Sequence, residues 1–238
     1  MQIRPLTTLA EFEQCVSLQR EAFGTPDREL MPMRFMVVVT HIGGAVLGAY
    51  EDDRLIAFVN TIPGIRHGKP YWHSQMLAVA PDSWNSGVGG QLKLAQRDEA
   101  LARGIDLIEW TFDPLESKNA YFNIEKLGVI VRRYYVNHYG EVGSRIFQGL
   151  DSDRVVAEWR LKHARPAITG ETRRLSIPAD LQSLKTRDLD AARELRRGVR
   201  QEFLTNLQDD FFGVAFERKA DAGEYVFIRG AANVDPGN

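Results

Sequence analysis

A glycine-bearing loop between Leu77 and Leu92 holds the residues best suited to chemistry. It reads LAVAPDSWNSGVGGQL, with glycines at 87, 89 and 90. Glycines directly after a strand let successive backbone N–H groups turn toward one point, and the start of a helix adds the positive end of its dipole. The loop is therefore suited to hold a phosphate, although it lacks the Gly-Lys-Ser/Thr of a Walker loop and the GxGxxG spacing of a dinucleotide site. A purely structural turn is the alternative.

Two side chains on predicted strands could accept a proton. Simple alternation along the strand Tyr71–Val79 places five residues on one face: Tyr71, His73, Gln75, Leu77 and Val79. The imidazole of His73 changes its charge near neutral pH, so it is a candidate base, with a hydrogen-bonded core histidine as the alternative. Glu109 lies inside the apolar strand Ile105–Phe112, where burial would favour proton uptake, and a paired structural acid is its alternative.

The elements around these residues follow from capping and periodicity. Thr8-Leu9-Ala10-Glu11 is a capping box that predicts a helix over about 8–23. Later segments alternate between short apolar runs and helical patterns. They are the hairpin strands Ala45–Tyr50 and Leu55–Ile62, the strand Tyr71–Val79, a helix from Val88 to Gly104, the strand Ile105–Phe112, the helix Ser117–Leu127 and the strand Val129–Val136. This order predicts an α/β fold whose mixed sheet has antiparallel N-terminal strands and a parallel β-α-β centre flanked by helices.

The last third of the chain predicts a strand, Val155–Leu161, a helix, Arg187–Leu207, and a closing β-hairpin. We divide the chain into a domain of residues 1–163 and an extension of residues 164–238. The extension has too many apolar positions to leave in water at roughly 25 cal/mol per Å². It must pack on the first domain or on a second copy of the chain, which would make the protein a homodimer.

The passage from Tyr71 to Gly128 resembles the GCN5-related N-acetyltransferase (GNAT) superfamily. In that family the fourth strand ends in Leu-x-Val-x-Pro, a Gly-x-Gly follows, and the next helix binds the pyrophosphate of acetyl-CoA. The matching positions here are Leu77, Val79, Pro81, Gly87 and Gly89. A second family motif, Tyr-x-Lys-x-Gly, is similar to the segment Ile124 to Gly128, and the resemblance covers about residues 3–160.

The resemblance implies an acyl-CoA-dependent N-acyltransferase that uses acetyl-CoA or another acyl-CoA and no metal. It implies coenzyme contacts from the strand end and the loop, at Leu77, Val79, Asn85, Ser86, Gly87, Val88, Gly89 and Gly90. It also implies contact of Asn119 with the pantetheine arm, and Asn119 should share a helix face with Asn123, four residues later.

The same resemblance assigns the proton transfer. His73 lies four residues before the Leu of Leu-x-Val, where relatives carry a Glu or His base, and Glu109 is the second choice. Backbone N–H groups around Met76 to Ala78 would stabilise the oxyanion. The acceptor is expected to be the amine of a small molecule or amino acid, because the chain shows no separate peptide-recognition module.

Two departures from the family pattern keep other functions open. Trp84 stands where relatives have Gln or Arg, and Ile124 stands where many have a tyrosine that protonates the leaving thiolate. That acid is optional, because a thiol with a reference pKa of about 8.5 leaves readily. Other hydroxyls that could supply a proton are Tyr121, Tyr134, Tyr135 and Tyr139. The alternatives are a non-catalytic acyl-CoA-binding regulatory module, a protein or peptide N-acetyltransferase, and an N-succinyltransferase.

Composition excludes several partners. Thirty Lys and Arg against 32 Asp and Glu give a net charge of −2, which does not favour nucleic-acid binding. Cys15 is the only cysteine, so no internal disulfide can form, and we expect a cytoplasmic protein. The longest apolar stretch, Gly43–Tyr50, is too short to span a membrane.

Two clusters of charged residues in the last third of the chain are candidate binding sites. Asp151 and Asp153 offer only two carboxylates in one turn, which is a minimal ligand set and does not favour a metal site. Arg193, Arg197 and Arg200 form a basic stripe that faces solvent or meets an acidic group, such as the 3′-phosphate of coenzyme A.

Overall fold

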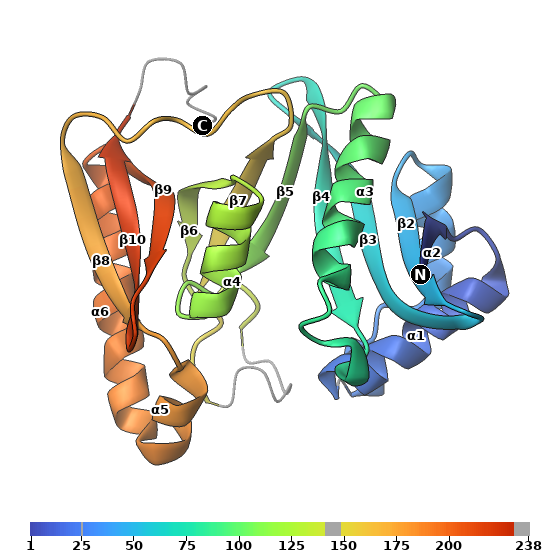
Figure 1. Cartoon of the computed structure of the whole chain (residues 1–238), viewed down its shortest axis with the longest axis horizontal. Helices are drawn as coiled ribbons and strands as arrows, with labels where there is room; N and C mark the ends of the chain where they lie inside the picture. Colours follow the sequence, from blue (N-terminus) through green and yellow to red (C-terminus); the bar gives the residue numbers. More distant parts are fainter. Residues whose placement is uncertain (25, 141–148, 231–238) are drawn as a thin grey trace. The chain divides into compact units, whose positions relative to one another are not determined.

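The computed structural model describes residues 1–24, 26–140 and 149–230 (Figure 1). It divides into two compact units, the first formed by Met1–Ile108 and the second beginning at Glu109. The division falls inside a strand, β5 (Leu107–Phe112). The expected boundary at 163/164 instead lies inside the second unit, because residues on both sides of it share one core.

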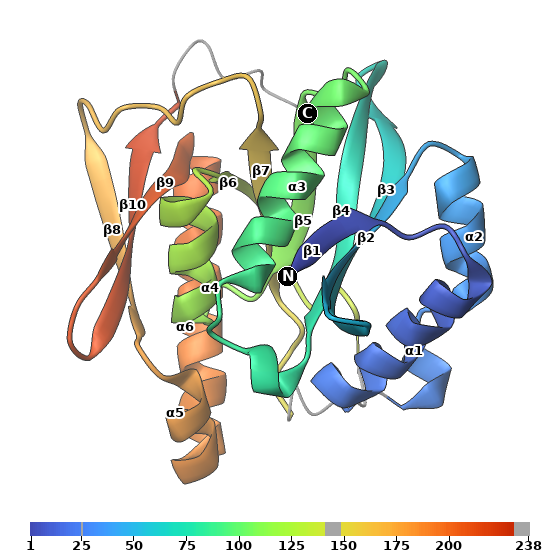
Figure 2. The same ribbon diagram turned by 45° about the vertical axis from the view of Figure 1, so that its right-hand side comes forward.

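The first unit is a four-stranded antiparallel sheet in the order β1-β2-β3-β4. Its elements in chain order are β1 (Gln2–Pro5), α1 (Leu9–Phe23), η1 (Asp27–Glu29), α2 (Met33–His41), β2 (Ala45–Glu51), β3 (Arg54–Arg66), β4 (Lys69–Val79), η2 (Pro81–Ser83) and α3 (Val88–Ala102). Two apolar clusters cover the sheet, one with Phe12 of α1 and Met36 of α2, the other with Leu92 of α3. The helices α1 and α2 therefore cover one face of this sheet and α3 covers the other (Figure 2).

The predicted capping box is confirmed. The Thr8 hydroxyl accepts a hydrogen bond from the Glu11 N–H at 3.3 Å, and the Glu11 carboxylate accepts one from the Thr8 N–H at 2.9 Å. Burial of the Glu11 carboxyl opposes ionisation, but hydrogen bonds from the Thr7 and Thr8 backbone outweigh it and lower the pKa of Glu11 from 4.5 to about 2. The ionised carboxylate therefore stabilises the start of α1.

We predict that this contribution depends on pH. Because the folded pKa is lower than the unfolded one, the stabilisation is complete above about pH 4.5 and is lost as the pH falls toward 2. Glu11→Gln should lower the free energy of unfolding at pH 7 and lose most of this effect at pH 2.5, as measured by urea denaturation. Glu13→Gln, at an exposed position of the same helix, is the control. A deficit in Glu11→Gln that is equal at both pH values would contradict the assignment.

Strand β4 contains a bulge that simple alternation does not predict. In the pairing with β3, Asn60 lies opposite Met76 but Thr61 lies opposite Ser74, so Gln75 is the extra residue. Before the bulge, Ser74 contacts α3; after it, Leu77 and Val79 pack on the α3 side while Met76 packs on the α1 and α2 side. The predicted single face from Tyr71 to Val79 is therefore wrong. His73 lies on the face covered by α1 and α2, opposite to Leu77 and Val79.

The second unit has the strand order β5-β7-β6-β9-β10-β8. Its further elements are α4 (Ser117–Tyr121), a π-helical turn η3 (Phe122–Lys126), β6 (Ile130–Tyr135), β7 (Arg154–Arg160), β8 (Thr172–Pro178), α5 (Leu181–Arg187), α6 (Leu189–Gln208), β9 (Phe211–Arg218) and β10 (Ala222–Arg229). The pairs β6-β7, β6-β9, β9-β10 and β10-β8 are antiparallel. Phe203 of α6 packs edge-on against Tyr225 and Phe227 of β10, with ring centroids 5.0 and 5.2 Å apart.

Polar bonds, buried or partly buried, connect the residues that follow position 163 to residues that precede it. Arg196 of α6 forms a bidentate ion pair with Asp113, which follows β5, at 2.8 and 2.7 Å. Arg165 binds the Glu125 carboxylate at 2.9 Å, and the same carboxylate accepts the Phe216 N–H at 2.8 Å. The hydroxyl of Tyr225 donates to the Pro114 carbonyl at 2.8 Å. Residues 164–230 are thus part of the core of the second unit.

The Arg196 pair should contribute strongly to stability. Arg196 is only 2% exposed, so its removal leaves the buried Asp113 carboxylate without its partner. We expect Arg196→Met to lower the free energy of unfolding by about 3–5 kcal/mol. Arg197→Met, one residue later in an exposed pair with Glu194, should change it by about 0–1 kcal/mol. Equal effects of the two substitutions in guanidinium denaturation would refute this ranking.

Within the described residues, no helix is long and apolar enough to cross a membrane.

Candidate functional site

The loop between β4 and α3 has a backbone that only certain residues adopt. Gly87, the residue before α3, has φ 87°, and Asn85 has φ 63°, both in the left-handed region. The Ser86 hydroxyl donates to the Ser83 carbonyl at 2.7 Å, and the Trp84 indole N–H donates to the Val79 carbonyl at 2.9 Å. These bonds fix the loop against the end of β4. Trp84, which departs from the family pattern, has a structural use here.

The first turn of α3 presents backbone donors. The first helical bond runs from the Gln91 N–H to the Gly87 carbonyl at 3.2 Å. Gly87, the N-cap residue, has no side chain to cap the helix, and the Ser86 hydroxyl accepts only the Val88 N–H, at 3.4 Å. The N–H groups of Gly89 and Gly90 precede the first helical bond, so the helix itself offers them no acceptor. Together with the helix dipole, they form a place for an anion.

The structure brings Gly89 next to Leu77 and Val79. A Cβ atom built on Gly89 would lie 3.4 Å from Leu77 Cδ2 and 3.8 Å from Val79 Cγ2, which is ordinary van der Waals contact. The fold therefore tolerates a small side chain at position 89. Asn85, Ser86 and Gly87 are exposed beside it, whereas the Val88 side chain is buried with Leu92. Val88 can meet a ligand only through its backbone.

The two candidate bases have different surroundings. His73 is half-buried on β4, opposite Ile62 of β3. Glu109 is 2% exposed, and its carboxylate accepts a bond from Arg133 at 2.5 Å. Burial opposes the charge on Arg133, but Glu109 and Glu158 outweigh it and raise the pKa of Arg133. This ion pair supports the structural alternative for Glu109, and sequence reasoning missed Arg133 as its partner.

Asn119 and Asn123 do not share a face, so this expectation is wrong. Asn119 is exposed on α4, whereas Asn123 is 4% exposed. The physical reason is that α4 continues as the π-helical turn Phe122–Lys126, which breaks the four-residue spacing. Asn119 can still meet a ligand from solvent, and Asn123 cannot do so without a rearrangement.

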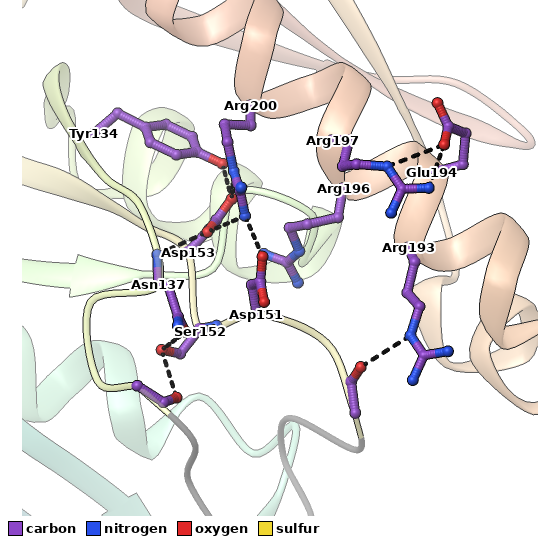
Figure 3. Close-up of polar contacts among 12 residues, drawn as sticks. Tyr134, Asn137, Asp151, Ser152, Asp153, Arg193, Glu194, Arg196, Arg197 and Arg200 are labelled. Carbon is purple, nitrogen blue, oxygen red and sulfur yellow. Dashed lines mark hydrogen bonds and ion pairs between the residues drawn. The ribbon is translucent and has the colours of Figure 1, made fainter.

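One candidate proton donor, Tyr134, and the basic stripe are bound to carboxylates of the second unit (Figure 3). The Tyr134 hydroxyl donates to Asp153 at 2.6 Å, and burial together with this carboxylate raises the pKa of Tyr134, which makes it a poor acid. Arg200 binds Asp151 at 2.5 Å and Asp153 at 2.8 Å.

The other two arginines of the stripe also have carboxylate partners. Arg193 pairs with Asp190 at 2.9 Å. Arg197 pairs with Glu194 (Figure 3). The stripe is thus neutralised by acids of its own unit. No group of three or more His, Cys, Asp or Glu side chains suited to a metal occurs in the described parts of the chain.

The fold and the loop together define a class: an α/β protein in which a bulged strand leads to a helix start that presents backbone N–H donors. Comparisons with known proteins agree. The family profile described as "Acetyltransferase (GNAT) family" matches residues 12–128. A search of curated proteins gives no match.

Solved structures share the fold. The ribosomal-protein-S18-alanine N-acetyltransferase from Escherichia coli is 15% identical with a TM-score of 0.55, covering 71% of this chain and 99% of its own. The aminoglycoside 6′-acetyltransferase type Ii is 21% identical with a TM-score of 0.54, covering 70% and 100%. An aminoglycoside 6′-N-acetyltransferase complexed with coenzyme A is 17% identical with a TM-score of 0.52, covering 70% and 100%. Residues 12–128 form a GNAT acetyltransferase domain, and the predicted α/β fold class is confirmed.

Gly89 provides a direct test of the coenzyme loop. Gly89→Val should weaken coenzyme A binding at least about tenfold, because its methyl groups extend beyond the Cβ position that fits against Leu77 and Val79 and displace the backbone N–H groups at the start of α3. Gly89→Ala, whose Cβ atom fits there, should keep the melting temperature near wild type. Isothermal titration calorimetry measures the affinity, and Gly198→Val, at an exposed position of α6 with open space around its Cβ atom, is the binding control. Unchanged affinity in Gly89→Val would remove the loop from the coenzyme site.

Proposed function

We propose that the protein transfers an acyl group, acetyl in the first instance, from acyl-CoA to the primary amine of a small molecule or amino acid. The observation that carries this proposal is the start of α3, where the N–H groups of Gly89 and Gly90 precede the first helical bond and Gly89 lies beside Leu77 and Val79 at the end of β4. A pyrophosphate carries two negative charges in a shape that successive N–H groups can bind. The loop has no basic side chain of its own, so its backbone supplies this contact.

The proposed chemistry is direct attack. The thioester supplies a carbonyl carbon that an amine nitrogen can attack, forming the C–N bond, after which the C–S bond breaks and the thiolate leaves. His73 accepts the proton that the amine loses, directly or through a water molecule, because an alkyl amine with a pKa of about 10.4 is mostly protonated at pH 7. N–H groups of β4 between Met76 and Ala78 stabilise the oxyanion. The thiolate takes a proton from solvent or from a nearby hydroxyl.

A covalent enzyme intermediate is not part of this proposal. Cys15 is fully buried in α1, and burial raises the pKa of its thiol, which disfavours the reactive thiolate. Glu109 is only the second choice as base, because its carboxylate is already paired with Arg133. Asn119 remains the proposed contact of the pantetheine arm, since it is exposed on α4.

The class of acceptor is a primary amine. Similar solved structures include aminoglycoside and ribosomal-protein-alanine acetyltransferases, and both kinds of acceptor present amines. We favour the amine of a small molecule or amino acid as the acceptor. We also propose that the protein acts in the cytoplasm. Succinyl is the alternative acyl group.

An acidic groove in the structure would favour a basic peptide as acceptor. One groove, of about 540 Å³, does have acidic walls formed by Glu13, Glu21 and Asp53. It lies at the start of β3 near Arg54, whereas His73 pairs with Ile62, eight residues further along that strand. At about 3.3 Å per residue the two are roughly 26 Å apart along β3. The groove therefore gives no support to a peptide acceptor.

Replacement of His73 tests the mechanism. We expect His73→Gln to lower kcat at pH 7 about 100-fold, the effect of removing a positioned base, while coenzyme affinity stays near wild type. The deficit should shrink as the pH rises toward 10, because the amine then loses its proton unaided. Thiol release from acetyl-CoA with a panel of amines measures the rate, and His41→Gln at an exposed position of α2 is the control.

The same assay separates the rival functions. A non-catalytic binding module would bind coenzyme A but release no thiol with any amine, from acetyl-CoA or from succinyl-CoA. Full activity of His73→Gln at pH 7 would reject His73 as the base and make Glu109 the next residue to replace.

A further inference from the structure

A buried polar network lies between α3 and the sheet of the first unit, and the coenzyme loop does not use it. Its members are Thr61 of β3, Ser74 of β4, and Lys93 and Gln96 of α3, which are 0%, 6%, 3% and 0% exposed. The Gln96 amide donates to the Thr61 hydroxyl at 2.5 Å and to the Ser74 hydroxyl at 3.0 Å. The Nζ atom of Lys93 donates to the Ser74 hydroxyl at 2.8 Å and to the side-chain carbonyl of Gln96 at 3.0 Å.

The network coincides with the β4 bulge. Thr61 and Ser74 face each other in the pairing immediately before the bulge, and Asn60 and Met76 face each other immediately after it. Gln96 therefore joins the two strands at the residue pair where the register changes. A bulge interrupts the backbone ladder, so side-chain bonds at this pair hold a register that the ladder alone specifies weakly.

A second set of bonds holds the bulge from the opposite face. The side-chain amide of Asn60 donates to the side-chain carbonyl of Gln75 at 3.3 Å and approaches the Met31 sulfur at 3.1 Å. Met31 is fixed in turn by Gln19, which accepts its N–H at 2.8 Å and donates to its carbonyl at 3.2 Å. The bulged residue is thus held from both sides of the sheet.

Burial of this polar network costs free energy of desolvation, so stability alone does not explain it. Buried polar groups must be desolvated, and burial lowers the pKa of Lys93 well below its usual value. Apolar side chains surround the network on the same face, including Leu77 and Leu92, so an apolar contact would fit the local packing. Fully bonded polar networks in a core fix one conformation instead of adding large net stability.

We propose that Gln96 is a positioning residue for acyl transfer: through Thr61 and Ser74 it fixes the β4 bulge, and with it the places of His73 and of the N–H groups after Gln75. His73 directly precedes Ser74 in the chain, and Met76 to Ala78 directly follow the bulge. Gln96 itself acts only through these groups. This inference rests on the proposed function, because it assigns to the bulge the alignment of base and oxyanion donors.

The test replaces Gln96 with Met, which keeps the length of the side chain but removes its hydrogen bonds. We expect kcat to fall roughly 10- to 100-fold, since a small misplacement of reacting groups has effects of this size, while the KM for acetyl-CoA stays within about twofold. Unlike His73→Gln, this variant should keep its deficit at high pH, because proton removal is not the step it impairs. Hydrogen exchange at the backbone N–H groups of residues 75–77 should become faster.

Two further variants control the test. Leu92→Met changes a buried side chain on the same helix outside the network, and it should leave kcat and the exchange at 75–77 near wild type. Thr61→Val removes the hydrogen bond between Gln96 and the Thr61 hydroxyl at nearly constant side-chain volume. It replaces Gln96→Met as the test variant if Gln96→Met does not fold. It should show the same split between kcat and KM.

The outcomes separate this inference from the proposed function. Unchanged exchange at residues 75–77 in Gln96→Met or Thr61→Val would overturn the inference, whether or not an acceptor has been found. Unchanged kcat would overturn it as well. A wild-type protein that releases no thiol with any amine would reject the proposed function on its own. Faster exchange in the variants would then show that Gln96 fixes the β4 bulge, but not that it assists acyl transfer.

Discussion

The β4 bulge at Gln75 is the constraint on which the rest of the first unit depends. One extra residue reverses the faces of β4, so that Leu77 and Val79 lie under the start of α3 while His73 lies on the face covered by α1 and α2. A regular strand would direct the candidate base and the apolar support of the coenzyme loop to the same side. The bulge separates them, so that His73 and the side chains of Leu77 and Val79 lie on opposite faces of one strand.

The second unit depends on a different interaction, the buried pair between Arg196 and Asp113. It connects α6 to the residue that follows β5, while Arg165 and the Phe216 N–H both bind Glu125 at the π-helical turn. These bonds make the C-terminal residues part of the core that shapes α4. The family profile match ends at residue 128, before Arg165, α6 and Phe216.

Much of the fold could be predicted from local patterns, and the errors have physical causes. The capping box at Thr8 and the glycine at 87 specify their elements through short-range bonds, so sequence reasoning found them. The helix α2 was missed because its run Met-Val-Val-Val-Thr has the β-branched composition of a strand, and tertiary packing of Met36 and Val39 decides it. The bulge and the π-helical turn each add a residue to a regular period, which alternation cannot reveal. The partner of Glu109, Arg133, lies on another strand, and only the folded chain brings the two together.

The central claim is that the start of α3 binds the coenzyme through its backbone, and the most direct measurement is a nuclear magnetic resonance titration of protein labelled with ¹⁵N-glycine. Addition of acetyl-CoA should shift the amide signals of Gly87, Gly89 and Gly90 saturably. Gly68, in the turn between β3 and β4, and Gly170, before β8, should keep their signals. Saturable binding that leaves the signals of Gly89 and Gly90 unchanged would contradict the account.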